Sequence, residues 1–420
     1  MTAAPPRAGL AAYLTVTAAY WAFMLSDGAL RMLVLLHFHK LGFSPVQLAY
    51  LFVLYEIAGM VTNLGAGWLA ARFGMVRTLY AGLGLQIVAL VLLAQLDAGW
   101  SIGASVIYVM LVQGLSGVAK DLSKTSAKSA VKLLAPTGEG GLFRWVAVLT
   151  GSKNAVKGAG FLLGAGLLAL AGFDAAVWGM AAVLAAILLG VVLFMPAGLP
   201  AGKKGVKLKE VISKSRDINW LSAARLFLFG ARDVWFVVGI PIYFYVVLSD
   251  GTPEGNRAAF FMIGGFMAVW TVLYGVVQAN APRLLRAREL GADALIATAQ
   301  RLVLGLAVVP IVLAVLVWLV PGAPLWLTMI LVLGLLAFGA AFALNSAVHS
   351  YLILAFAEAE RVTMDVGFYY MANAGGRLAG TLLSGLCYQW GGVEACLAAA
   401  GIMLILSRVM AGRLGAAAAA

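Results

Sequence analysis

Charged side chains are scarce in this chain of 420 residues: Asp, Glu, Lys and Arg together make up 11% of it, against 63% hydrophobic residues. A soluble domain carries about 25% charged residues, so this chain cannot cover an ordinary water-facing surface. A helix that crosses a membrane needs about 20 mostly apolar residues. The length therefore fits roughly ten to fourteen membrane-spanning helices and excludes a large soluble domain.

Cysteine is scarce as well, with only Cys387 and Cys396 in the chain. Two thiols nine positions apart provide neither a disulfide framework nor a metal site. No phosphate-binding loop, nucleophile elbow or paired-carboxylate motif occurs in the sequence. We therefore expect no cofactor, no metal site, no enzymatic activity and no ATP-driven transport by this chain alone. We also expect the first apolar stretch to be retained as a helix rather than cleaved as a signal peptide.

Apolar stretches separated by turn-forming residues predict twelve transmembrane helices. Their approximate limits are 11–38, 46–70, 78–96, 102–121, 143–170, 174–195, 218–247, 258–281, 296–319, 325–352, 364–388 and 393–411.

The basic residues between these stretches lie mostly on alternate loops. If the N-terminus is cytoplasmic, 19 of the 29 Lys and Arg residues fall on inner segments and 2 on outer loops, with the other 8 inside the stretches. Loops rich in Lys and Arg stay in the cytoplasm, so both termini are predicted to be cytoplasmic. The net charge of +12 thus reflects topology and predicts no nucleic-acid partner.

A Lys-rich segment at residues 197–217 lies at the midpoint of the chain and predicts a cytoplasmic linker between two halves, 1–196 and 218–420. The halves show a weak internal repeat, Lys157-Gly-Ala-Gly160-Phe-Leu-Leu-Gly164 against Arg377-Leu-Ala-Gly380-Thr-Leu-Leu-Ser384, and acids 206 positions apart at Asp27 and Asp233. Two six-helix halves joined by a basic loop resemble the major facilitator architecture.

The segment that follows the second stretch supports this resemblance. Its residues Gly67, Arg72 and Gly74 match the loop signature of the major facilitator superfamily, while Ala71 replaces the usual acid. The resemblance implies an all-α membrane protein of twelve transmembrane helices in two six-helix pseudo-symmetric halves.

Eight basic residues fall inside the apolar stretches, where an ionisable group costs at least ~2.5–3.5 kcal/mol: Arg31, Lys120, Lys153, Lys157, Arg225, Arg232, Arg301 and Arg377. The acids in the same stretches are four: Asp27, Glu56, Asp121 and Asp233. Intramembrane charges usually face a polar cavity or a partner. The excess of four positive charges predicts a cavity for an anionic substrate.

The spacing of the cations predicts that they converge, because residues four or seven positions apart share a helical face. We predict a substrate-binding site that consists of Arg31, Lys120, Lys153, Asn154, Lys157, Arg225, Arg232, Asn373 and Arg377. Arginine suits a phosphate-like group because its planar fork donates to two oxygens at once. The alternative is that Arg31 pairs with Asp27 within its own helix and that Arg232 only stabilises packing.

Asp27, Glu56 and Asp233 are the candidates for proton coupling, because a carboxyl group in a low-dielectric environment holds its proton more readily than one in water. The alternative is that these acids only neutralise nearby arginines. Lysines at 120, 124, 128 and 132 form one basic helical stripe. This stripe either guides an anion towards the inner mouth or contacts anionic lipid headgroups.

Five segments are similar to the ArsJ branch of the superfamily, the organoarsenical exporters of bacterial arsenic-resistance operons: residues 20–39, 116–134, 149–158, 218–236 and 367–385. The resemblance implies that 1-arseno-3-phosphoglycerate is exported from the cytoplasm, which confers arsenate resistance. It implies a functional partnership with a glyceraldehyde-3-phosphate dehydrogenase, which makes that compound from arsenate. We accordingly expect a monomer that spans the bacterial cytoplasmic membrane many times and contacts membrane lipid.

Other functions remain open from the sequence. A major facilitator transporter of another organophosphate, of phosphate or of an acidic drug would have the same cationic cavity. A sensor that binds an anion without transporting it would need a signalling domain from a partner. An enzyme embedded in the membrane is disfavoured, because the buried groups include no recognisable nucleophile and base.

The predicted topology can be tested by labelling cysteines in a chain that carries Cys387→Ser and Cys396→Ser. Because the 197–217 segment is predicted to be cytoplasmic, Lys204→Cys should react with a membrane-impermeant maleimide in everted vesicles and remain unlabelled in intact cells. Lys40→Cys, in a predicted outer loop, is the matched control and should react in intact cells. Labelling of Lys204→Cys in intact cells would contradict the assignment.

Overall fold

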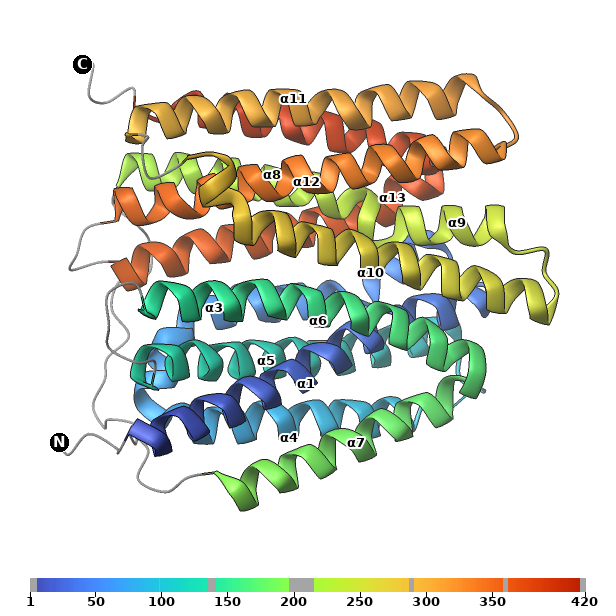
Figure 1. Cartoon of the computed structure of the whole chain (residues 1–420). Coiled ribbons are helices and arrows are strands. Elements are labelled where there is room, and N and C mark those ends of the chain that lie inside the picture. Colours follow the sequence, from blue (N-terminus) through green and yellow to red (C-terminus); the bar gives the residue numbers. More distant parts are fainter. Residues whose placement is uncertain are drawn as a thin grey trace.

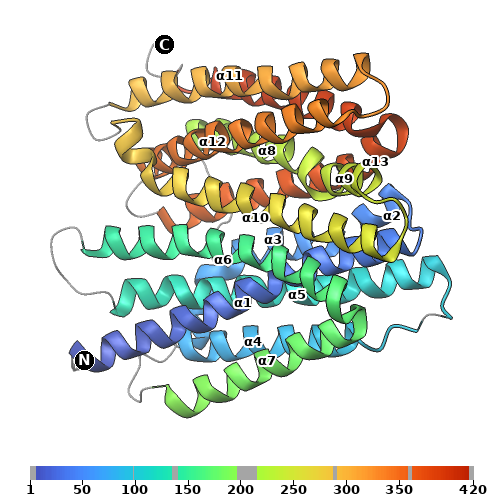
Figure 2. The ribbon, with the colours of Figure 1, turned by 45° about the vertical axis from the view of Figure 1, so that its right-hand side comes forward.

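The computed structural model describes residues 6–97, 99–134, 141–195, 215–286, 291–357 and 362–415. Within this part of the chain almost every residue is helical, and the helices lie side by side in one bundle (Figure 1). The first helix begins and the last helix ends at the same end of the bundle, which we call the termini end. Figure 2 shows the same bundle turned by 45°.

The described part of the first half of the chain forms seven helices. They are α1 (Pro6–Lys40), α2 (Pro45–Tyr50), α3 (Val53–Phe73), α4 (Met75–Leu93), α5 (Ile102–Leu134), α6 (Gly141–Ala171) and α7 (Phe173–Phe194). The second half forms α8 (Arg216–Val234), a π-helical turn η1 (Trp235–Gly239), α9 (Ile240–Leu248), α10 (Pro253–Leu284), α11 (Ala292–Leu319), α12 (Leu325–Phe356) and α13 (Val362–Ala411).

The described residues contain eleven apolar helical segments long enough to cross a membrane. The last of them, Asp365–Ala411, contains a break at Gly391 and Gly392. Gly392 has φ +64°, a conformation that favours glycine, so this segment is two helices that turn back on each other. The twelve predicted helices are therefore confirmed. The predicted linker could not be compared, because residues 196–214 lie outside the described part.

One helix is longer than the sequence predicted. The fourth apolar stretch was expected to end at residue 121, but α5 continues without a break to Leu134. The polar residues after Lys120 are therefore helical, and Lys124 lies one turn further along the same face. At the start of the second half, the hydroxyl of Ser215 accepts a hydrogen bond from the N–H of Ile218 and caps α8.

Glycines bring two pairs of helices into close contact, one pair in each half. In the first half α1 packs on α6, and a Cβ added to Gly28 would lie 2.5 Å from the carbonyl oxygen of Lys157. In the second half α8 packs on α13, and a Cβ on Gly380 would lie 2.5 Å from the carbonyl oxygen of Gly230. Small residues permit such backbone contact between helices in lipid.

These close contacts also show which positions of the first half correspond to which positions of the second half. Gly28 faces Gly160 on α6, and Gly230 faces Gly380 on α13. On α1, Asp27 lies one position before Gly28. On α8, Asp233 lies three positions after Gly230. The two acids are therefore offset by about one helical turn, and the position that corresponds to Asp233 is occupied in the first half by Arg31.

The two halves meet backbone to backbone at the end away from the termini. A Cβ on Gly385 of α13 would lie 2.6 Å from the carbonyl oxygen of Pro45, at the start of α2. A Cβ on Gly264 of α10 would lie 3.1 Å from the Cα of Leu162 on α6. The halves are thus in close contact at this end through both α2–α13 and α6–α10.

A π-helical turn interrupts the first span of the second half directly after Arg232 and Asp233. The hydroxyl oxygen of Ser384 on α13 accepts hydrogen bonds from the backbone N–H groups of Val238 and Gly239, both at 3.1 Å. π turns occur mostly as single-turn bulges within α-helices, frequently at functional sites. Ser384 therefore fixes the turn against α13 just beyond the two charged residues.

The close contact of α1 with α6 predicts a stability effect. Gly28→Ala places a methyl group against the backbone of α6 and should lower the free energy of unfolding by about 1–3 kcal/mol. Gly179→Ala is the matched control, because a Cβ at this position of α7 meets nothing within 4 Å. Thermal unfolding in detergent compares the two variants, and equal midpoints would contradict the close packing.

Candidate functional site

A chain of ion pairs runs through the interior of the bundle and joins α1, α3, α8 and α13. The carboxylate of Glu56 on α3 accepts hydrogen bonds from Arg31 on α1 at 3.2 Å and from Arg377 on α13 at 2.6 Å. Arg377 also lies 3.5 Å from one oxygen of Asp233 on α8. The other oxygen of Asp233 pairs with Arg232 at 2.5 Å. Two carboxylates therefore connect three arginines from three helices.

Tyr55 joins a second ion pair to this chain. Lys157 on α6 pairs with one oxygen of Asp27 on α1 at 2.6 Å, and the hydroxyl of Tyr55 donates to the other oxygen, also at 2.6 Å. The ring of Tyr55 faces Nζ of Lys120 at 3.9 Å and the guanidinium of Arg31 at 5.4 Å from its centroid. A cation over an aromatic face is stabilised by roughly 0.5–2 kcal/mol. Tyr55 thus contacts three charged groups, Asp27, Lys120 and Arg31.

The acids of this ion-pair network are covered, whereas its cations are partly accessible. Asp27, Glu56 and Asp233 expose at most 2% of their side chains. The four cations that pair with them expose 15–19%. The network therefore presents positive charge to any molecule that reaches it.

A neighbouring polar cluster surrounds Arg225 on α8. Its guanidinium donates to the side-chain oxygen of Asn373 and to both oxygens of Ser346, each at 3.0 Å. Gln278 on α10 donates to the hydroxyl of Ser346 at 3.4 Å and accepts from Asn154 on α6 at 3.2 Å. Every one of these partners is neutral, so they do not cancel the positive charge of Arg225.

The charge balance of the site is positive. Within the described part of the chain, neither Lys120 nor Arg225 lies within 4 Å of a carboxylate. Together with the four paired cations, they make six positive groups against the three carboxylates of the network. The sequence predicted an excess of four positive charges over all the apolar stretches, and these two clusters alone have an excess of three.

The structure brings most of the predicted site residues into these two clusters. The ion-pair network contains Arg31, Lys120, Lys157, Arg232 and Arg377, and the polar cluster contains Asn154, Arg225 and Asn373. Lys153 is half-buried on α6, one turn before Lys157. Arg301 was counted among the cations buried in the bundle, and this was wrong: it is exposed on α11. After Arg301 that helix is apolar on every side, so the longer part of its sequence gave no sign of which face turns inward.

The alternative pairing of Arg31 with Asp27 does not occur in the structure. Asp27 is occupied by Lys157 and Tyr55, and Arg31 turns to Glu56. Arg232 does pair with its neighbour Asp233, and its guanidinium also lies over three aromatic rings, those of Phe229, Phe236 and Phe342, at 5.1–5.7 Å.

The lysines of the basic stripe on α5 have different surroundings. Lys120 faces the ring of Tyr55, whereas Lys124 pairs with Asp121 at 2.6 Å and donates to Asn63 at 2.7 Å. The side chains of Lys128 and Lys132 lie outside the described part. Of the two lysines whose side chains are described, Lys120 belongs to the network and Lys124 does not.

Sequence reasoning missed three residues of the site, Tyr55, Ser346 and Gln278. Tyr55 is adjacent to the intramembrane Glu56, and this proximity was the one signal available for it. Ser346 and Gln278 are neutral residues, and none of the predicted site residues lies on their helices, α12 and α10. Their role depends on the side chain that faces them from α8, which periodicity does not reveal.

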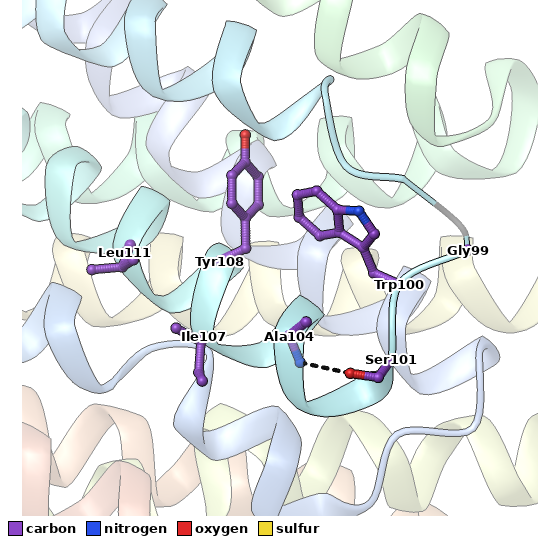
Figure 3. Close-up of a pocket in the computed structure, with 7 residues that line it drawn as sticks. All are labelled: Gly99, Trp100, Ser101, Ala104, Ile107, Tyr108 and Leu111. Carbon is purple, nitrogen blue, oxygen red and sulfur yellow. Dashed lines mark hydrogen bonds between the residues drawn. The ribbon is translucent and has the colours of Figure 1, made fainter.

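A surface groove lies at the start of α5, far from the charged clusters (Figure 3). Residues 99–101 and one face of α5 from Ala104 to Leu111 line it, and none of these side chains is charged. Trp100 and Tyr108 meet edge to face at 5.0 Å. Lys120 lies 9 positions after Leu111, the lining residue nearest to it in the chain, about 14 Å along the helix, so this groove does not contribute to an anion site.

Comparisons with known proteins concern nearly the whole chain. Residues 16–353 match the sequence model of the Major Facilitator Superfamily. A crystal structure of the nucleoside transporter NupG (D323A mutant) has a TM-score of 0.70 at 15% identity and covers 96% of this chain and 99% of its own. A structure from work on substrate recognition in proton dependent oligopeptide transporters has a TM-score of 0.66 at 13% identity, covering 96% and 98%. No curated protein matches the chain in sequence.

The pairing of Asp27 with Lys157 predicts coupled effects on stability. Lys157→Gln leaves a buried carboxylate without its cation, so it should destabilise the protein, and Asp27→Asn in the same chain should restore much of the loss. The coupling energy should be about 1–3 kcal/mol, below that of a fully buried pair, because Lys157 exposes 18% of its side chain.

Chemical or thermal unfolding of both single variants and the double variant in detergent measures this coupling. Arg301→Gln, on the exposed face of α11, is the control and should change stability little. Additive effects of the two substitutions would show that the two side chains do not form the ion pair.

Proposed function

The chain belongs to the major facilitator superfamily and is a secondary transporter rather than an enzyme, and we propose that it carries a small organic anion with phosphate-like groups. The observation that supports this proposal is the charge balance. Six cations meet three carboxylates, and the carboxylates are the covered partners. An intramembrane charge that is not neutralised is costly, and an anionic substrate would provide the missing negative charge.

The two clusters would bind different parts of such a substrate. Arg225 and Arg232 are seven positions apart on α8, about 10 Å along the helix. Three arginines near the carboxylates would bind one anionic group through paired donors, and Arg225 with its amide and hydroxyl partners would bind a second group. The proposed substrate-binding residues are Arg31, Lys120, Lys153, Asn154, Lys157, Arg225, Arg232, Asn373 and Arg377, with Asp27, Glu56 and Asp233 as proton-coupling groups.

We further propose that the substrate is 1-arseno-3-phosphoglycerate, which the ArsJ-like segments imply. Each of the five segments carries at least one of the proposed site residues. A molecule with an arsenate group and a phosphate group has two separate oxyanions, one for each of the two proposed clusters. Export of this compound would confer arsenate resistance in partnership with a glyceraldehyde-3-phosphate dehydrogenase.

The cysteines support an oxyanion substrate over trivalent arsenic. Trivalent arsenic is soft and binds thiolates, usually two or three together. Cys387 is half-buried, and Cys396 is buried and donates to the carbonyl oxygen of Ser384 at 3.5 Å. The chain has no third cysteine. A hard, oxygen-rich anion suits arginine and lysine instead.

The orientation of the described state follows from the predicted topology. With both termini in the cytoplasm of a bacterial cell, the end at which Gly385 meets Pro45 and Gly264 meets Leu162 would face outward. The halves are in contact there, so this state would be closed to the outside, as expected of an exporter before it releases its substrate.

Uptake by everted membrane vesicles tests the function directly. Vesicles that contain the chain should accumulate enzymatically generated 1-arseno-3-phosphoglycerate. Arg31→Gln should lower the uptake rate at subsaturating substrate about tenfold or more, because a hydrogen bond to a charged group contributes about 1.5–3 kcal/mol. Arg31→Lys should recover only part of the loss, because an ammonium group cannot donate as a planar fork.

Arg301→Gln is the matched control and should leave uptake unchanged. The double variant Cys387→Ser, Cys396→Ser should also transport normally. Uptake that is indifferent to Arg31→Gln would remove the anion site, and loss of uptake in a well-expressed double cysteine variant would favour thiol capture.

A further inference from the structure

Glu56 is bound asymmetrically within the ion-pair network. Its side chain is fully buried, and one oxygen, Oε1, accepts hydrogen bonds from both Arg31 and Arg377. The other oxygen, Oε2, is buried without a hydrogen-bond partner among the described residues. A carboxylate held by one oxygen is less firmly bound than one with both oxygens paired.

The contacts of Glu56 are the contacts that an anionic substrate would need. Arg31 comes from the first half of the chain and Arg377 from the second, and both guanidinium groups keep 15–19% of their side chains accessible. A phosphate-like group that reached these two arginines would compete with Glu56 for the same N–H donors. The internal carboxylate of Glu56 thus holds the donors that the oxyanion of such a substrate would use.

The other two acids would keep their partners in that exchange. Asp27 retains Lys157 on one oxygen and Tyr55 on the other. Asp233 retains Arg232, which contacts it through both Nε and a terminal nitrogen. Glu56 alone depends entirely on the two arginines that the substrate would take.

We propose that the anionic substrate and ionised Glu56 exclude each other at Arg31 and Arg377, so that each anion bound drives one proton onto Glu56. This inference rests on the proposed anion site. A buried carboxylate that loses its cations takes up a proton, because an unpaired charge is far more costly there than a neutral carboxylic acid. The proton comes from the solvent, and no covalent bond in the substrate changes.

Other charged groups near Glu56 influence this exchange. Lys120 approaches from α5 and Lys157 from α6, while Asp27 on α1 and Asp233 on α8 bring negative charge. Lys157 is already bound by Asp27. Lys120 is the cation to which a displaced Glu56 could move instead, and in that case no proton would be taken up.

Calorimetry on the purified full chain tests the exchange, with 3-phosphoglycerate as the probe. The measurement is made at pH 8 in two buffers of different ionisation enthalpy, because a phosphate monoester with a second pKa of about 6 is fully ionised there. The wild type should take up about one proton per anion bound, and its Kd should rise up to tenfold from pH 7.5 to 8.5. In Glu56→Gln, proton uptake should fall close to zero and Kd should change less than twofold over the same range.

Two further variants separate Glu56 from other titrating groups. Asp121→Asn removes a buried acid that pairs with Lys124 outside the network and should keep the uptake of the wild type. Lys120→Arg alters a proposed binding residue, so its Kd is free to differ from that of the wild type. Because arginine keeps its charge at every pH used, the change of its Kd from pH 7.5 to 8.5 should still match that of the wild type. If Glu56→Gln does not fold, infrared difference spectra of the wild type should still show the carbonyl stretch of a new carboxylic acid when the anion is added.

The outcomes distinguish this inference from the function on which it rests. Absence of 3-phosphoglycerate binding by the wild type would overturn the anion site and this exchange together. Binding without proton uptake, without a new carboxylic acid signal, or with uptake that persists in Glu56→Gln would overturn the exchange and leave the anion site standing.

Discussion

A carboxylate inside a membrane must have a cation beside it, and this requirement determines how the helices of this protein are placed. Each buried acid of the network has at least one partner on a different helix. Asp27 ties α1 to α6, Glu56 ties α3 to α1 and α13, and Asp233 brings α8 to α13. Ionic side chains reach only a few ångströms, so each pair also sets how far one helix is shifted along the other.

Glycines allow the helices to approach closely enough for these ion pairs to form. Gly28 follows Asp27 directly and brings α1 against the backbone of Lys157, the partner of that acid. In the second half Gly380 lies one turn after Arg377 and contacts α8 three positions before Asp233. Close backbone contact and a charged pair thus occur within one turn of each other in both halves. The repeat in the sequence reflects this shared arrangement more than it reflects matched charges.

Much of this architecture could be predicted from the amino-acid sequence. Apolar stretches of spanning length gave twelve helices, and helical spacing indicated that Lys157, Arg232 and Arg377 face the interior. The partners could not be predicted, because Glu56 could pair with Arg31 or Arg377 only after α3 had been placed between α1 and α13. The position of Arg301 was mispredicted for a different reason: after this residue α11 is apolar all round, so most of the helix does not distinguish the lipid-facing side. The periodicity of a sequence shows which residues share a face of one helix. Predicting which residues form an ion pair also requires knowing how far the two helices are shifted along each other.

The position of Glu56 along its helices has a mechanical consequence. It lies 11 positions after Pro45, where α2 begins, and 17 before Phe73, where α3 ends. Transporters of this superfamily expose their site to one side at a time as one half rocks against the other. In such a rotation the ends of the helices travel far, while points near the axis hardly move. A contact between Glu56 and Arg377 can therefore act as a pivot. The contacts at the far end must separate, among them that of Gly385 with Pro45, which lies about 16 Å from Glu56 along the chain of α2 and α3.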